Sequence, residues 1–134
     1  MTKYFFDTST LIYALELDSK NAQEYIQNAV NDGHVGISAA AVMEYCAGCY
    51  IQKKPEMIDI FTDFIRTCGF EIRSVDREAA LCAAKIRGMF PSIKSLDAIH
   101  LACAKVSGAD YFCTNDLKLL QYSDPDLKII RVEA

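Results

Sequence analysis

Short apolar runs alternate with longer amphipathic stretches along the whole chain. Residues 3–7 form an apolar run that ends at a carboxylate, and Leu11, Ile12 and Leu15 follow it at helical spacing. The same pattern predicts strands at 3–7, 35–38, 70–75, 111–114 and 127–132, and helices at 9–17, 20–31, 39–50, 55–67, 76–88, 95–108 and 116–122. Because strands and helices alternate from end to end, the sequence predicts an α/β fold with a parallel sheet covered by helices on both faces.

Residues that favour helix ends support these boundaries. Ser38, Asp76 and Ser95 stand at the starts of predicted helices, where their side chains can cap the first turn. Pro55 occupies a first turn, where proline is tolerated, and Gly69 follows the end of the same helix. We therefore expect the helices to begin and end close to these positions.

Length and composition predict one globular domain over residues 1–134. Hydrophobic residues make up 51% of the 134-residue chain and charged residues 24%, which excludes disorder and low complexity. No window approaches the ~20 uninterrupted apolar residues of a membrane helix. The apolar run at the amino terminus is too short for the core of a signal peptide. We therefore expect a cytoplasmic protein that does not bind membranes.

Six cysteines could indicate disulfides or a metal site, and Cys46 and Cys49 have the spacing of a redox or zinc pair. A redox pair belongs at the start of a helix that follows a strand, whereas this pair lies in the middle of one. A zinc site needs a second pair at similar spacing, which the other cysteines do not provide. We expect reduced thiols that pack in the core of a cytosolic protein.

The charge balance leaves the class of partner open. The chain carries 18 acidic and 14 basic side chains, a formal net charge of −4. This balance argues against a protein that holds nucleic acid through a broad basic face. It is compatible with a basic partner, and with an enzyme whose acidic residues gather metal ions, because bound metal reverses the local charge.

Two acidic residues stand at the carboxyl ends of predicted strands. Asp7 ends the first strand, and Asp116 comes shortly after the strand at 111–114. Ligands of parallel α/β sheets bind beyond these ends, so both carboxylates enter one crevice if the two strands are neighbours. A helix cap is the structural alternative for either residue alone.

Two further acidic residues lie inside apolar helices. Glu44 stands in the most apolar helix, with no lysine or arginine within a helical turn. Burying an unpaired carboxylate is costly, so we expect a cationic partner; a distant arginine or a solvent-facing helix edge are the structural alternatives. Asp97 lies in the first turn of its helix, where the helix dipole alone would stabilise an anion.

These four residues together supply hard oxygen ligands, which suit Mg²⁺ or Mn²⁺ better than zinc. Four carboxylates that converge in one crevice repel one another, so cations would be needed to hold them together. The typical chemistry of such a site is two-metal phosphodiester hydrolysis, in which the metals activate water and stabilise the leaving oxygen. The candidate metal-binding and catalytic set is Asp7, Glu44, Asp97 and Asp116.

The chain resembles a PIN domain, and within that superfamily the toxin ribonucleases of VapBC toxin–antitoxin pairs. The first matching motif is the strand end at 7–9, and the second is a strand end at Ser38 followed six residues later by Glu44. The segment 94–102 matches the helix that carries the third acid of the family, and 114–116 matches the strand end that carries the fourth. All of the motifs occur in the family's order, and together they span the whole chain.

This resemblance implies a three-layer α/β/α fold with a central parallel sheet of about five strands. It implies an acidic crevice that binds Mg²⁺ or Mn²⁺ and cleaves RNA endonucleolytically, with Asp7 and Asp97 as the most direct ligands. Ser9, Thr114 and Asn115 would orient carboxylates or water. The resemblance also implies a homodimer and an antitoxin partner whose tail covers the crevice.

Basic residues are sparse near the expected RNA path. The candidates for phosphate contact are Lys85, Arg87 and Lys94, and ordinary solvated helix charge is the alternative for each. His100 lies one helical turn after Asp97 and could face the crevice, or it could be a hydrogen-bonded core histidine.

Other functions of such a chain predict different residues. The segment around Asp7 is similar to the first motif of haloacid-dehalogenase-type phosphatases, but their second aspartate is replaced here by Ser9. A receiver-like phosphoacceptor domain needs a lysine at a strand end, and Lys118 does not stand at one. A catalytically silent PIN-like binding module remains the third alternative, although such a module would usually have lost one of the acids.

Overall fold

Five parallel strands form the central sheet of the computed structural model, which describes all residues from 1 to 134. The strands are β1 (Lys3–Phe6), β2 (His34–Ser38), β3 (Glu71–Arg73), β4 (Tyr111–Thr114) and β5 (Lys128–Arg131). They are hydrogen-bonded in the order β3-β2-β1-β4-β5, and every neighbouring pair is parallel. Every predicted strand is present, which confirms the parallel α/β fold.

The helices also match the predicted positions. They are α1 (Thr8–Leu15), α2 (Lys20–Asp32), α3 (Ala39–Ile51), α4 (Met57–Cys68), α5 (Arg77–Met89) and α6 (Ser95–Val106). The short helix expected at 116–122 is a 3₁₀ helix, η1 (Leu117–Gln121). No helix has both the length and the apolar character needed to cross a bilayer.

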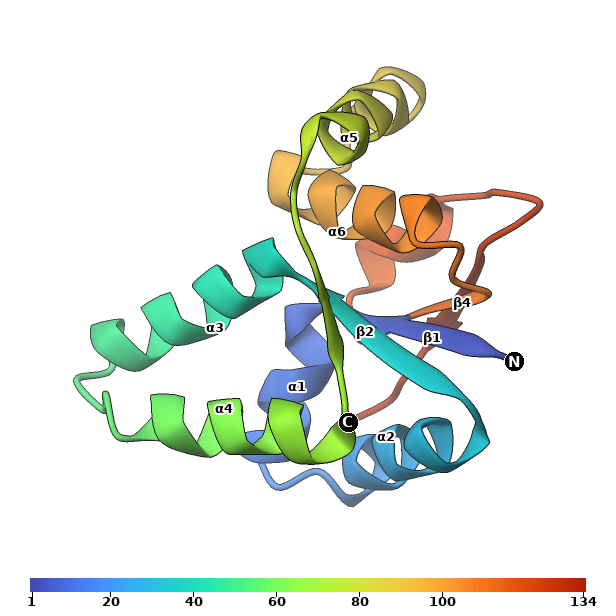
Figure 1. Cartoon of the computed structure of the whole chain (residues 1–134). Coiled ribbons are helices and arrows are strands. Elements are labelled where there is room, and N and C mark those ends of the chain that lie inside the picture. The colour runs from blue at the N-terminus through green and yellow to red at the C-terminus, as the bar shows by residue number, and fades with distance from the viewer.

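Alternating side chains of the strands separate the two covering layers. Phe5 packs with α5 and α6 on one face of the sheet, and Phe6 packs with α1 to α4 on the other. Figure 1 shows α5 and α6 above the sheet and α2 below it, with α3 and α4 extending to the left. The observed architecture is therefore the three-layer α/β/α arrangement.

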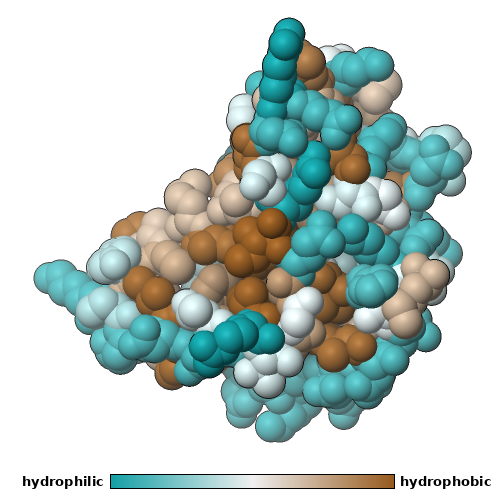
Figure 2. All heavy atoms as spheres, viewed as in Figure 1, coloured by the Kyte–Doolittle hydropathy of each residue, from teal (hydrophilic) through white to brown (hydrophobic).

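Large apolar side chains are exposed on two neighbouring helices. Met43, Tyr50 and Ile51 of α3 and Ile60 of α4 are all more than half exposed, with 56%, 66%, 80% and 52% of their surface accessible. Figure 2 shows apolar side chains gathered in the angle between these helices. Contiguous apolar surface of this kind is typical of a site of protein–protein contact.

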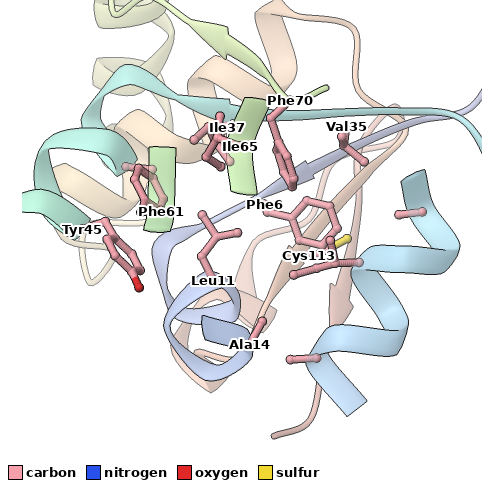
Figure 3. Close-up of a cluster of buried hydrophobic side chains, with 14 of the residues drawn as sticks. Phe6, Leu11, Ala14, Val35, Ile37, Tyr45, Phe61, Ile65, Phe70 and Cys113 are labelled. Atoms are coloured by element: carbon pink, nitrogen blue, oxygen red, sulfur yellow. The ribbon is translucent and has the colours of Figure 1, made fainter. Parts of the chain in front are cut away.

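The core below the sheet holds α3 in place. Tyr45 of α3 stacks on Phe61 of α4 with ring centroids 4.2 Å apart, and Leu11 and Phe6 lie in the same cluster (Figure 3). Cys49 is buried in this cluster and Cys46 packs against it, as expected for core thiols, and all six cysteines are free. Because Tyr45 is anchored, the helix turn that carries Glu44 has a fixed orientation.

Most predicted helix ends are confirmed, but one start and one cap are not. The helix α4 begins at Met57, so Pro55 precedes the helix instead of standing in its first turn. The side chains of Ser38 and Asp76 accept hydrogen bonds from first-turn N–H groups, and Gly69 ends α4 in the left-handed conformation with φ 73°. The prediction that Ser95 caps its helix is wrong: Lys94 occupies the cap position and Ser95 is the first helical residue. Lys94 has the extended backbone of a cap residue, with φ −67° and ψ 156°, so the helix begins one residue earlier than predicted.

Candidate functional site

A cavity of about 210 Å³ opens at the carboxyl end of the sheet. It lies where the chain reverses its direction of growth across the sheet, because β1 is flanked by β2 on one side and β4 on the other. Such switch points are the usual ligand sites of parallel α/β sheets. The residues that line the cavity are Asp7, Thr8, Ser9, Ile12, Glu44, Asp97, His100 and Asp116.

All four acidic residues singled out in the sequence therefore line one cavity, although they come from different elements. The pairing of β1 with β4 aligns Phe6 with Cys113, so Asp7 and Thr114 follow at the same edge of the sheet. Glu44 extends from α3 and Asp97 from the first turn of α6. Strand order brings Asp7 and Asp116 to the same edge of the sheet, and the packing of α3 and α6 adds Glu44 and Asp97.

Asp7 is the most deeply buried of these acids, with 3% of its surface exposed. Its Oδ1 accepts hydrogen bonds from the Ser9 hydroxyl at 2.7 Å and from the Thr10 N–H at 3.4 Å, which makes it the N-cap of α1. Its Oδ2 accepts a hydrogen bond from the Thr114 hydroxyl. Burial raises the pKa of Asp7 above its ordinary value, although these hydrogen bonds oppose the shift.

A second layer of hydrogen bonds orients the groups that touch Asp7. The Thr114 hydroxyl accepts the Asp116 N–H at 2.9 Å, and the Ser9 hydroxyl accepts the Asn115 N–H at 3.0 Å. The side-chain amide of Asn115 donates to the Val132 carbonyl at 2.6 Å instead of contacting the cavity. Asn115 thus acts on Asp7 through its backbone, while its side chain ties the end of β4 to the end of the chain.

Glu44 has a histidine partner instead of a lysine or arginine. Its Oε1 accepts hydrogen bonds from the Thr8 hydroxyl and from His100 Nε2, the latter at 3.1 Å. The side chain is 39% exposed, so it also stands at a solvent-facing edge of α3. The hydrogen bond from His100 lowers the pKa of Glu44, and that from Thr8 lowers it further, against the opposing effect of burial.

Asp97 and Asp116 complete the acidic lining. Burial raises the pKa of Asp97, and the negative charges of Asp116 and Glu44 raise it further. Asp116 is the N-cap of η1, with its Oδ1 accepting the Lys118 N–H at 2.9 Å. Asp7 and Asp116 are therefore helix caps, as the structural alternative proposed, and line the cavity as well.

The lining fits a hard divalent cation. No lysine or arginine forms an ion pair with any of the four acids, so their charges are not neutralised by the protein's own cations. No three carboxyl, imidazole or thiol groups lie close enough together to form a complete metal site. The donors that the lining does supply are carboxylate oxygens, the ligands that Mg²⁺ prefers, and Mg²⁺ binds through one or two of them together with waters and substrate phosphates.

Comparison with known families shows to which family the chain belongs. A model of the PIN domain matches residues 4–125. The chain belongs to the PIN domain family. A comparison of this PIN domain with curated protein sequences gives no match.

Solved structures of low sequence identity share the fold of this PIN domain. It is similar to VapBC2 from Rickettsia felis, bound to a DNA fragment from its promoter, with a TM-score of 0.81 and 18% identity over 97% of this chain and 98% of that chain. For DNA-bound VapBC from Salmonella typhimurium the TM-score is 0.79 and the identity 21%, over 98% of both chains. For a toxin–antitoxin complex from Klebsiella pneumoniae the values are 0.71 and 21%, over 92% of this chain and 94% of that chain.

The structure adds two cavity residues of this PIN domain that the sequence did not place there, and a third for which the sequence left two alternatives. Thr8 and Ile12 line the cavity, and His100 both lines it and is buried, so its two alternatives hold together. Thr8 could have been found from its hydroxyl directly after Asp7, and His100 from its helical spacing to Asp97. His34 is exposed at the start of β2.

The three basic candidates do not line the cavity of this PIN domain. Lys94 stands at the cap position of α6, and its charge opposes the rise in the pKa of Asp97. Arg87 donates to the carbonyls of Ile93 at 2.9 Å and Pro91 at 3.2 Å, so it holds the connection that leads to Lys94. Lys85 is exposed on α5.

Proposed function

We propose that this PIN domain is a Mg²⁺- or Mn²⁺-dependent endoribonuclease and the toxin of a toxin–antitoxin pair. One observation carries the proposal: four acidic side chains from separate elements line one cavity, and no lysine or arginine pairs with them. Burial of a carboxylate without such a pair is unfavourable, and Asp7 and Asp97 both have raised pKa values. A site of this kind is stabilised by binding a cation.

The acidic side chains have different functions in this proposal. Asp7 and Asp97 hold the cation most directly, and Glu44 and Asp116 complete its surroundings. The bound cation supplies activated water and neutralises charge at the phosphate that is cleaved. Ser9 and Thr114 fix the two oxygens of Asp7 through their hydrogen bonds, so that this carboxylate does not need to reorganise when the substrate binds.

Phosphate contacts would come from the rim of the cavity. We assign them to Lys94 first, because its charge already acts on Asp97, and then to Lys85 and Arg87. Since Arg87 donates to two backbone carbonyls, its main contribution would be to hold Lys94 in place. Changing Lys94 to alanine should therefore raise the KM for RNA more than it lowers kcat.

The nuclease proposal is tested with purified, partner-free protein and structured RNAs. We expect cleavage with Mg²⁺ or Mn²⁺, no cleavage in chelator, and no cleavage by Asp97→Asn. Asp59→Asn is the matched control, because Asp59 also lies in the first turn of a helix, α4, but is exposed and away from the cavity. Cleavage that persists in chelator or in Asp97→Asn would refute the mechanism.

The same experiment tests the alternative of a catalytically silent binding module. That alternative predicts neither cleavage nor Mn²⁺ binding, whereas a nuclease should bind Mn²⁺ and lose it with Asp7→Asn. A phosphatase that used Asp7 as its nucleophile would instead release phosphate from small phosphoesters and leave internal RNA bonds intact.

We also propose a homodimer that binds an antitoxin. The exposed apolar surface of α3 and α4 supports a protein partner, and one structure that shares this fold is a toxin–antitoxin complex. A neighbouring small reading frame that encodes a DNA-binding protein with an extended tail would supply the candidate. We expect its product to co-purify with this chain and to block RNA cleavage; a freely active complex would contradict the proposal.

A further inference from the structure

A chain of hydrogen bonds runs from the start of α3 through α6 and back to α3. The Ala41 N–H donates to the Ser38 hydroxyl at 3.0 Å, and this hydroxyl lies 2.7 Å from His100 Nδ1. His100 Nε2 lies 3.1 Å from Oε1 of Glu44. Ser38 and His100 are 0% and 1% exposed, so these hydrogen bonds are shielded from bulk solvent.

The chemistry of these groups fixes the direction of each hydrogen bond. A backbone N–H can only donate, so Ala41 uses the Ser38 oxygen as an acceptor. The hydroxyl hydrogen of Ser38 then has one available acceptor, His100 Nδ1, and leaving a buried hydroxyl hydrogen unpaired is unfavourable. His100 therefore carries its hydrogen on Nε2 and donates it to Glu44.

The arrangement leaves one oxygen of Glu44 free. Both donors, Thr8 and His100, bind Oε1, and Oε2 accepts no hydrogen bond from the protein. Glu44 is otherwise a long side chain at a partly exposed helix edge, and holding it in one rotamer costs conformational entropy. The tether from α6 supplies this constraint from a buried, rigid position.

We propose that His100 is a positioning residue that fixes Glu44 so that its Oε2 is presented to the cation of the cavity. This rests on the proposed function, because it assumes that the cavity binds Mg²⁺ or Mn²⁺. Ser38 contributes by fixing the tautomer of His100. His100 also links the helices that carry Glu44 and Asp97, since it stands one turn after Asp97 on α6.

Two amide substitutions separate positioning from packing. In His100→Gln the side-chain amide reaches the position of Nε2 and can donate to Glu44. In His100→Asn the amide stands at the position of Nδ1 and is too short to reach it. Both variants bury a neutral amide, so a loss that is specific to His100→Asn reports the missing hydrogen bond.

The readout is Mn²⁺ binding without RNA, measured by calorimetry or by electron paramagnetic resonance, with cleavage kinetics as the second measurement. We expect His100→Asn to weaken Mn²⁺ binding by about 10–100-fold and His100→Gln to restore most of it. Glu44→Gln should weaken binding to a similar extent, and the double variant His100→Asn/Glu44→Gln should show no further loss. Additive losses, or wild-type binding by His100→Asn, would overturn the proposal.

A measurement on the wild-type protein covers the case in which these variants unfold. Nitrogen NMR of His100 should show a protonated Nε2 and an unprotonated Nδ1, and the opposite tautomer would overturn the proposal. Failure of the proposed function has a different signature: the wild-type protein would then bind no Mn²⁺ and cleave no RNA, which refutes both. Wild-type binding and cleavage with an unaffected His100→Asn refutes the positioning role alone.

Discussion

Asp7 shows how one side chain can serve the fold and the site together. It caps α1 through Oδ1, and it is held by Thr114 through Oδ2, at a position only 3% exposed. Burial raises the pKa of Asp7, although three hydrogen-bond donors oppose the shift. The fold therefore fixes the position of the Asp7 side chain, but burial disfavours its negative charge. A bound cation would stabilise that charge.

The raised pKa predicts how Asp7→Asn changes stability. A folded-state pKa above the unfolded value means that protonation favours folding, so this contribution is complete below the ordinary value of 3.8 and is lost as pH rises through the folded pKa. In chelator at neutral pH, Asp7→Asn should thus be more stable than wild type, and the difference should shrink as the pH falls toward 4. Thermal unfolding between pH 4 and 8 measures it, with Asp59→Asn as the control. An Asn variant that is less stable at pH 8 would contradict the sign.

Thr114 provides a second prediction at the residue scale. Its hydroxyl donates to Asp7 and accepts the Asp116 N–H at 2.9 Å. Thr114→Val therefore removes the hydrogen bonds to both acids with little change in side-chain volume. We expect a loss of about 10–100-fold in kcat/KM for RNA. The comparison is Thr10→Val, an equally buried threonine whose hydroxyl lies 3.5 Å from the Cys113 carbonyl and touches neither acid. Equal losses in the two variants would show that packing, not orientation, is responsible.

At the scale of elements, the helices are positioned by their ends and by close approaches of the backbone. Ser38 caps α3, and the same hydroxyl contacts His100, so the start of this helix and the orientation of Glu44 are linked. The end of α2 is fixed by Gly33, where a Cβ would lie 2.0 Å from the Thr2 carbonyl oxygen. That close contact permits the hydrogen bond from His34 N–H to the same oxygen at 2.9 Å, which aligns β2 beside β1.

Two glycines should respond to alanine in opposite directions. Gly48 lies within α3 and has no neighbouring atom within 4 Å of an added Cβ, so Gly48→Ala should stabilise the protein by about 0.5–1 kcal/mol through helix propensity. Gly33→Ala should destabilise it by about 1–3 kcal/mol, because the Thr2 backbone must move. Urea unfolding of both variants measures the two changes. Destabilisation by Gly48→Ala would show that α3 is less regular than described.

At the scale of the whole molecule, strand order determines the site. The chain first adds β2 and β3 on one side of β1 and then β4 and β5 on the other, which leaves a switch point between the two halves. Separate apolar clusters hold the two helix layers against the sheet, with Phe6 in one and Phe5 in the other. The cavity lies at the edge where the layers meet, so elements of both contribute to it.

Cation binding should consequently stabilise the whole fold. A ligand that binds only the folded state adds RT ln(1 + [L]/Kd), which is about 2.7 kcal/mol at a hundredfold excess over Kd. We expect Mn²⁺ to raise the melting temperature of wild type and of Asp59→Asn, but not that of Asp97→Asn. Differential scanning calorimetry in chelator and in Mn²⁺ makes the comparison. An equal rise in Asp97→Asn would place the cation elsewhere.

Much of this protein is determined by local sequence. The alternation of apolar runs places the strands and helices, because each element needs one face or both faces buried, and the caps at Ser38, Asp76 and Gly69 follow from local backbone chemistry. The four acids stand out for a similar reason, since carboxylates at strand ends or inside apolar helices are unusual without a partner.

Only the tertiary structure decided which groups meet. The pairing of β1 with β4 depends on hydrogen bonds between segments more than a hundred residues apart, such as Asp7 N–H to the Cys113 carbonyl, and no local pattern encodes it. The sequence predicts a cationic partner for Glu44, and the packing of α3 against α6 adds a contact that no local pattern indicates, the hydrogen bond from the buried ring of His100. Periodicity places each residue on its element, but the contacts between elements arise from packing over the whole chain, and these contacts set the geometry of the cavity.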